Sequence, residues 1–334
     1  MKTGTRLEAR CSSKKIFIGL SVCAALFVLC VSVQAQLKDK PKIGVLTPAE
    51  RQWEGAAFRE GLRSLGYIEG SNILIDVRSA EGKLERMPAL TAALIHSDVD
   101  LIVSVNTPST RAAMEATKTI PIIMTAVGDP VGLGVVSNLA RPGGNVTGLS
   151  NMSGDLAGKR LELLKEAVPK AQRIAVMMHP DDPIVPIQVK DVNAAAARMG
   201  VELEIIPVRD ASELENAFQR AVHWRAQGLL RLAGQATVIG PPTAQLALKH
   251  QLPAMLLVRQ DVEAGALMSY FTDHQALFRR AATYVDKILK GTKRGEIPIE
   301  QPSRFEFYVN LKTAKQIGLT IPPNVLARAD GVIK

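Results

Sequence analysis

Small polar side chains that could hold a ligand follow an apolar run at residues 101–105. Asn106, Thr107 and Ser109 stand together there, and Pro108 suits the first turn of a helix. The free N–H groups at the start of a helix, beside hydroxyl groups, favour an anion such as a carboxylate. The pattern therefore predicts an anion site at this turn. An ordinary helix cap at Thr107, with no ligand, explains the same residues equally well.

Two further turns of the first half have the same character. Gly128 and Asp129 follow a later apolar run, and Thr47 follows the first one. The carboxylate of Asp129 would complement an ammonium group. Together with the anion site, this carboxylate predicts a site for an α-amino acid. Asp129 has a second interpretation, as the first residue of a turn before Pro130, but we favour the ligand role.

The second half of the chain is expected to supply the opposite wall of the site. Its candidates are His179, Gln235, Arg259 and Tyr270. Arg259 follows a predicted strand, where its guanidinium could hold a carboxylate, and a surface position is the alternative. His179 is equally consistent with a solvated loop. Tyr270 fits structural packing better than stacking on a ligand.

Short apolar runs alternate with amphipathic helical patterns along the chain. The predicted strands are 42–46, 73–77, 101–105 and 120–125, then 173–178, 202–208, 228–232 and 252–257. Runs that are apolar at consecutive positions suit parallel strands buried on both faces. Strands that alternate with helices predict doubly wound α/β sheets. The fold class is therefore α/β, with two Rossmann-like lobes that each contain a parallel sheet.

The order of elements also predicts how the lobes are connected. A turn-rich break at 140–145 separates the two series of strands, and a late amphipathic helix follows the second series at 276–289. Such a helix is expected where the chain returns to the first lobe. We expect lobe 1 to contain 42–150 plus 272–297, and lobe 2 to contain 151–271 plus 298–334. Several crossings between lobes would form a hinge.

The N-terminal segment has the order of a secretory signal peptide, residues 1–35. Lysines and arginines come first, an apolar run follows, and small residues end at Ala35. An uncleaved membrane anchor is the alternative, because the apolar run is nearly long enough to cross a bilayer. All three cysteines lie in this segment, so the mature chain would contain no disulfide. Its removal lowers the formal charge from +9 to +5, and the scattered remainder argues against nucleic acid as a partner.

Several sequence blocks together resemble one known family. They are Lys42-Ile-Gly-Val-Leu46, Asp129-Pro-Val131, Leu139-Ala-Arg-Pro-Gly-Gly-Asn-Val-Thr-Gly148, Val262-Glu-Ala-Gly265, Asn310-Leu-Lys-Thr-Ala314 and Ile321-Pro-Pro323. In this order they resemble the ABC transporter substrate-binding proteins, in the group that contains the tryptophan/tyrosine importer components. The resemblance covers essentially all of residues 42–334.

The resemblance implies a type I periplasmic-binding-protein fold with three hinge crossings and a small-molecule ligand in the cleft. It also implies ABC permease and ATPase subunits as partners, a periplasmic location and import of an amino acid or related compound. We expect a monomer. A periplasmic protein that senses its ligand and signals to a membrane receptor is the alternative, because both functions need the same hinge.

Three features of the second lobe depart from the family pattern. Arg231 interrupts a run that is usually apolar, Ala233-Gly234-Gln235 stands where an acidic or proline-containing turn is common, and Phe271 stands where glycine is usual. The identity of the ligand is therefore open, and an aromatic ligand is one possibility.

The remaining sequence patterns argue against catalysis. The five histidines are dispersed without a metal-binding spacing, and no Gly-x-Ser-x-Gly motif occurs. A chain without cysteine after processing also lacks a thiol nucleophile. We predict that the protein is not an enzyme and needs neither cofactor nor metal.

Overall fold

The apolar runs of the chain form two separate β-sheets among the residues that the structure describes. The structure is a computed structural model, and it describes residues 40–50, 53–234 and 239–334. The predicted signal peptide, residues 1–35, and the candidate Gln235 lie outside this range. Pro41–Lys334 forms one compact unit.

The first sheet has five parallel strands in the order β2-β1-β3-β4-β5. They are β1 (Lys42–Thr47), β2 (Leu74–Ser79), β3 (Leu101–Val105), β4 (Ile122–Val127) and β5 (Val146–Ser150). Every residue of β3, β4 and β5 is buried, which explains why these runs show no polar alternation in the sequence.

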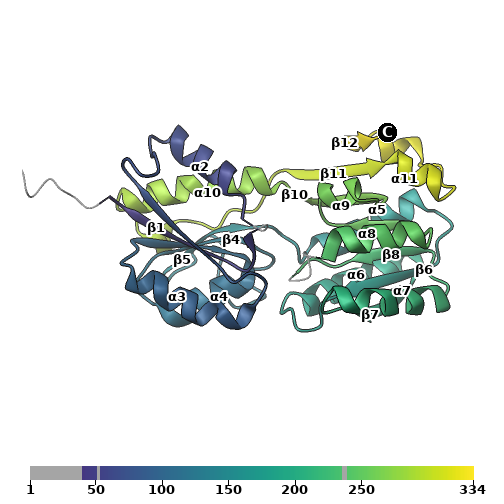
Figure 1. Ribbon diagram of the computed structural model, residues 1–334, viewed down its shortest axis with the longest axis horizontal. Helices are drawn as coiled ribbons and strands as arrows, with labels where there is room; N and C mark the ends of the chain where they lie inside the picture. The colour runs from purple at the N-terminus through teal and green to yellow at the C-terminus, as the bar shows by residue number, and fades with distance from the viewer. Residues whose placement is uncertain (1–39, 51–52, 235–238) are drawn as a thin grey trace, which may run out of the picture. The chain divides into compact units, whose positions relative to one another are not determined.

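Helices cover both faces of the first sheet. One face packs α2 (Gly55–Ser64) and α10 (His274–Leu289), and the other packs α3 (Met87–His96) and α4 (Asn106–Ala116). Because successive strand side chains point to opposite faces, Leu101 and Val103 join the α2/α10 core whereas Ile102 joins the α3/α4 core. Figure 1 shows the yellow-green α10 beside the purple α2, although the two lie far apart in the sequence.

The second sheet has seven strands in the order β12-β11-β10-β9-β8-β6-β7. They are β6 (Arg173–Met178), β7 (Glu202–Pro207), β8 (Gly228–Arg231), β9 (Ala254–Leu256), β10 (Met268–Thr272), β11 (Phe305–Asn310) and β12 (Gly331–Ile333). All neighbouring strands are parallel except β10 and β11, which pair antiparallel with Tyr270 opposite Phe307.

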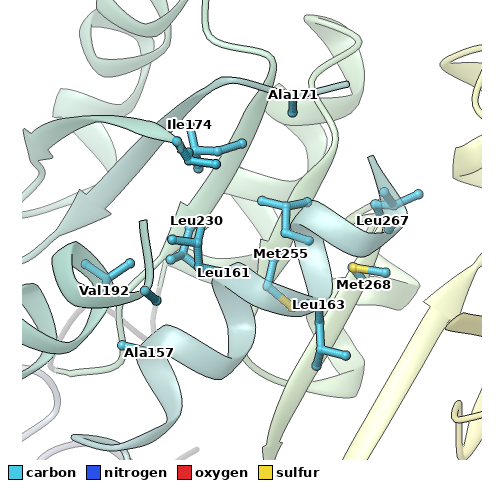
Figure 2. Packing of buried hydrophobic residues seen from close by; sticks show 14 of the residues in the cluster. Ala157, Leu161, Leu163, Ala171, Ile174, Val192, Leu230, Met255, Leu267 and Met268 are labelled. Atoms are coloured by element: carbon cyan, nitrogen blue, oxygen red, sulfur yellow. The ribbon is translucent and has the colours of Figure 1, made fainter. Parts of the chain in front are cut away.

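Two cores enclose the second sheet. One contains residues of α5 (Leu156–Ala167), α6 (Val185–Met199), α11 (Leu311–Gln316) and α12 (Pro323–Leu326). Figure 2 shows part of it, with Leu161 of α5 among Ile174, Leu230 and Met255 of the sheet. The other core contains residues of α7 (Leu214–His223) and α8 (Gly240–Lys249). The short α9 (Arg259–Glu263) follows β9, and single 3-10 turns occur at Leu84–Arg86, Ala211–Glu213 and Arg294–Glu296.

Three passes of the chain connect the sheets: from β5 to α5, from β10 to α10, and from the segment before β11 into β11. The passes hydrogen bond to one another, because Thr272 Oγ1 donates to the carbonyl of Asn151 at 2.7 Å and the amide of Asp273 donates to Arg304 at 3.3 Å. The prediction of two Rossmann-like lobes with parallel sheets and a multi-strand hinge is confirmed.

The expected lobe boundaries stay a prediction, which the structure lets us refine. Leu149 bridges to Glu300, and the amide of Ile299 donates to the carbonyl of Leu139 at 2.8 Å. These bonds hold residues 299–300 against the first sheet. We therefore propose that the last crossing follows residue 300 rather than residue 297.

The sequence missed or displaced several local features. Strands β10 and β12 and helix α9 had not been predicted, and β2 and β4 end two residues later than expected. The late ends matter because they bring Ser79 and Val127 into the sheet. The expected helix cap at Thr107 is wrong, since α4 already includes Asn106 and its N-cap position is Val105.

Candidate ligand-binding site

A cavity of about 640 Å³ is lined by residues of both lobes. This volume is within the usual range for a small-molecule site. The first lobe contributes residues that follow β1, β3 and β4, and the second contributes residues that follow β6, β8 and β9. The cavity thus lies where ligands bind in α/β sheets, beyond the carboxyl ends of the strands.

The first wall is shaped by an unusual main chain. Asn106, directly after β3, has a φ of 65°, and Ala126, near the end of β4, has a φ of 59°. Both residues line the cavity. Non-glycine residues seldom adopt positive φ, and such strain concentrates at functional sites. Backbone strain therefore occurs at the ends of two adjacent strands, β3 and β4, on the same side of the cavity.

Of the three predicted hydroxyls of this wall, the structure brings one to the cavity. Thr107 lines it at the start of α4. Thr47 Oγ1 instead donates to the carbonyl of Ala49 at 2.8 Å, and the Ser109 hydroxyl lies 3.8 Å from the sulfur of Met87. Thr47 and Ser109 are buried and neither lines the cavity.

Gly128 and Asp129 are separated by the fold although they are adjacent in sequence. Gly128 lines the cavity, and a Cβ atom there would lie 2.3 Å from Ser153 Oγ and 2.9 Å from Ile184 Cδ1. Asp129 does not line it, because Asp129 Oδ1 accepts the amide of Gly132 at 2.8 Å and starts a turn. The turn interpretation of Asp129 thus describes its position.

Only one of the described candidates in the second lobe lies at the cavity. His179 lines it, and its Nδ1 accepts the amide of Asp181 at 3.3 Å. Arg259 is exposed and pairs with Glu263 at 2.7 Å. Tyr270 stacks on Phe305 at 5.7 Å between ring centroids, as expected for packing.

The second wall contains a buried arginine that the candidate set omitted. Arg231, the last residue of β8, lines the cavity and is only 1% exposed. Its Nε and Nη1 atoms are buried without a hydrogen-bond partner among the described residues. Burial lowers the pKa of Arg231, and the charge of Asp261 opposes this effect.

A second arginine lies close to the first. Arg160, on α5, is completely buried and its guanidinium lies 5.7 Å from the ring centroid of Phe271. Burial and, to a lesser extent, the positive charge of Arg231 lower the pKa of Arg160 to about 9, although the charge of Asp191 opposes the shift. Arg160 is therefore still protonated at neutral pH, and Arg231 lies close enough to act on it electrostatically.

The carboxylates of the second wall already bind main-chain amides. Asp182 Oδ1 accepts from Ile184 at 3.1 Å, and Asp210 Oδ1 accepts from Ser212 at 2.8 Å. Asp261 Oδ2 accepts from Leu257 at 3.1 Å and from Val258 at 3.3 Å. These three carboxylates line the cavity, and their hydrogen bonds stabilise the loops around it.

Two more ionisable groups complete the lining. Glu54, before α2, is half-buried, and burial together with the charge of Asp273 raises its pKa. His274, the first residue of α10, is half-buried with its Nε2 atom shielded from solvent, and its ring contacts Phe271 at 5.2 Å. Burial lowers the pKa of His274 to about 4 despite the charge of Asp273, so His274 is neutral at neutral pH.

Some of the lining residues that were not among the predicted candidates still had a signal in the sequence. Arg231 is a charge within an apolar run, and Phe271 is an aromatic side chain at a usually small position; both had been noted as departures, and both line the cavity. Glu54 and His274 had no comparable signal, because each reaches the cavity through the packing of α2 and α10 on the first sheet.

Two features are absent from the described ranges, 40–50, 53–234 and 239–334. None of the helices there combines the length and apolar character that a membrane crossing demands. Nor does that part of the chain gather three histidine, cysteine or acidic side chains in a way that could hold a metal ion.

Known proteins match the chain over most of its length. Residues 47–333 match the sequence model of a family described as ABC transporter substrate binding protein. A tyrosine-binding protein of Clostridioides difficile is 31% identical over an alignment of 274 positions, which covers 78% of this chain and 75% of that protein.

Solved structures give the same result. A conserved domain protein from Vibrio cholerae has a TM-score of 0.82 at 28% identity, and an ABC domain in complex with L-Trp from a streptococcus has a TM-score of 0.81 at 27% identity. Each match covers 88% of this chain and 100% of the other.

Proposed function

Because this chain belongs to the family of ABC transporter substrate binding proteins, we propose that it is the periplasmic solute-binding component of an ABC-type importer. The family consists of binding proteins rather than enzymes. In this proposal the chain captures an amino acid or a related small polar compound between its lobes and delivers it to a membrane permease with its ATPase.

The observation that carries the proposal is the cavity lined by both lobes. Its lining combines apolar side chains, among them Leu84, Leu257 and Phe271, with the polar groups of strand ends and the start of α4. An amino acid with a large apolar side chain matches this combination, since it has an apolar body and a charged end. The relatives described as tyrosine-binding and as a complex with L-Trp support the aromatic class.

Capture follows from the three-pass hinge. A ligand that contacts both walls stabilises the arrangement in which the lobes approach each other, so binding shifts the population toward it. A shift from mostly apart to mostly together requires a few kcal/mol of differential affinity. Contacts from two lobes supply such a difference, because each wall alone offers only part of them.

Binding is tested by calorimetry and small-angle scattering with L-tyrosine, L-tryptophan, aliphatic amino acids and neutral sugars. We expect an aromatic amino acid to bind and to reduce the radius of gyration. Binding of aliphatic amino acids alone would contradict the aromatic class. Failure of every compound to bind or to compact the protein would contradict the binding function itself.

Import is tested separately by uptake of the labelled ligand in cells with and without this gene. We expect uptake to fall when the gene is removed and to return with a plasmid copy. Binding without any effect on uptake would favour the sensing alternative. Sequencing of the N-terminus of the exported protein checks the predicted removal of residues 1–35.

A further inference from the structure

The strongest unexplained feature of the cavity is the guanidinium of Arg231, whose Nε and Nη1 have no hydrogen-bond partner among the described residues. Arg231 lines the cavity, is 1% exposed, and has two buried N–H donors without an acceptor. A buried charge without a partner lowers stability, so structural arginines in protein interiors are normally paired. An acceptor supplied by a ligand would remove this penalty only in the bound protein.

No carboxylate of the described chain forms an ion pair with Arg231. Asp261 acts on it through its charge, but Asp261 Oδ2 accepts two main-chain amides. Asp261 Oδ1 faces Gly240, where a Cβ atom would lie only 1.9 Å away. Asp261 is therefore fixed at the start of α9 and does not reach the guanidinium within ion-pair distance.

The surroundings of Arg231 add positive charge and hold it in place. The guanidinium of Arg160 lies close enough to repel it, and Arg160 Nε and Nη1 also lack acceptors. Gln188 binds the amide and the carbonyl of Ala233, at 2.9 and 2.8 Å, so the chain just after Arg231 is held from both sides. The main chain just after Arg231 is thus fixed before any ligand arrives.

We propose that the ligand carries a carboxylate and that this carboxylate binds Arg231, on the wall formed by the second lobe. A guanidinium offers two parallel donors to a carboxylate, which makes the pair strong and directional. Phe271 lines the same wall and would contact an apolar part of the ligand. The inference rests on the proposed binding function and deepens it by naming the chemical class of the ligand and its anchor.

The test compares ligands that differ only in their charged groups. The probes are L-tyrosine, 3-(4-hydroxyphenyl)propionate, which lacks the ammonium group, and tyramine, which lacks the carboxylate; ribose is the neutral probe. Affinities are measured by calorimetry for the natural protein and for Arg231→Gln. We expect both carboxylates to bind the natural protein and both to lose at least about 100-fold in affinity in Arg231→Gln.

Arg220→Gln is the matched control. Arg220 lies on α7 of the same lobe, does not line the cavity, and pairs with Glu204 at 2.6 Å. We expect its substitution to leave the affinity for carboxylates within about twofold. Arg231→Lys keeps a positive charge without the double donor and should recover part of the loss, which a merely structural role for Arg231 would not produce.

Thermal unfolding without ligand checks that the variants fold. We expect Arg231→Gln to unfold at the same or a higher temperature, because it removes an unpaired buried charge. If Arg231→Gln fails to fold, Arg231→Lys and the three-probe series on the natural protein still decide the question.

The outcomes separate this inference from the proposed function. Carboxylates that bind Arg231→Gln as tightly as the natural protein overturn the inference. Binding of tyramine or ribose without binding of either carboxylate also overturns it, while the solute-binding function stands. If no probe of any class binds, both the inference and the proposed function fail.

Discussion

The two walls of the cavity are built by different means. The wall from the first lobe has an unusual main chain, with the left-handed Asn106 and Ala126 beside the start of α4. The wall from the second lobe contains the buried charge of Arg231 and the carboxylates of Asp182 and Asp261, which are fixed on loop amides.

This difference indicates a division of labour. Main-chain amides and strand ends bind polar groups of many ligands, and they persist as long as the turns keep their conformation. A buried guanidinium binds one type of group strongly and can be lost by one substitution. The first wall is therefore suited to general capture, and the second to the choice of ligand.

The largest expected effect concerns His274, which lines the cavity and has its Nε2 atom buried. The unfolded chain binds a proton at the ordinary pKa of 6.5, whereas the folded protein does so at about 4. Protonation of His274 therefore leaves the free energy of unfolding unchanged above pH 6.5. As the pH drops from 6.5 toward 4 it lowers this free energy by about 3 kcal/mol in total.

Urea unfolding between pH 7.5 and 4 gives the free energy of unfolding of the natural protein and of His274→Gln. The difference between these two free energies should change with pH by the amount that His274 contributes. His223→Gln is the control, because His223 is exposed at the end of α7. A constant difference between the natural protein and His274→Gln across this pH range would show that His274 does not carry a buried, neutral ring.

The next test concerns the close approach of the walls at Gly128. A side chain there meets Ser153 and Ile184, so Gly128→Val should lower stability by about 2 kcal/mol and weaken ligand binding. Gly134→Asn is the control, because nothing lies within 4 Å of its Cβ position and asparagine tolerates positive φ. An unchanged melting temperature and an unchanged affinity in Gly128→Val would show that the two walls do not approach closely at this residue.

Glu54 tests whether the first wall also recognises charge. If it binds the ammonium group of an amino acid, Glu54→Gln should lower the affinity for L-tyrosine about tenfold and leave the affinity for 3-(4-hydroxyphenyl)propionate unchanged. Because burial raises the pKa of Glu54, the affinity for the amino acid should also rise with pH as this carboxyl ionises. Glu50→Gln, at an exposed position nearby, is the control. Equal loss for both ligands would contradict an ammonium contact.

The smallest expected effect tests the strained main chain. The left-handed conformation of Ala126 costs about 1–2 kcal/mol of conformational free energy, and this cost is absent for glycine. Loss of the methyl contacts offsets this gain, so Ala126→Gly should change the free energy of unfolding by less than about 0.5 kcal/mol. Ala113→Gly, inside α4, should lower it by about 1–2 kcal/mol. Equal losses at both positions would mean that Ala126 is not strained.

The sequence located the first wall better than the second. Asn106, Thr107 and Gly128 reach the cavity because the carboxyl ends of neighbouring parallel strands meet at one edge. The sequence could not tell which way each side chain beyond a strand end would turn. Thr47 and Asp129 stand at such ends and bind their own turns instead.

In the second lobe, a shift of one position along β10 determines which aromatic side chain reaches the cavity. Tyr270 and Phe271 are neighbours on β10, and successive strand side chains point to opposite faces. Phe271 therefore lines the cavity while Tyr270 packs on Phe305. The strand had not been predicted, so its two faces could not be assigned from the sequence.

By itself the sequence determined the two series of buried strands, the helices between them and the edge at which a ligand site would form. These follow from local patterns of apolar residues, because a strand buried on both faces must be apolar throughout. The tertiary structure alone decided that Arg231 Nε and Nη1 are left without an acceptor in the part of the chain that is described. That fact depends on how segments distant in the sequence, such as α5, α9 and the end of β8, use their hydrogen-bonding groups when packed together.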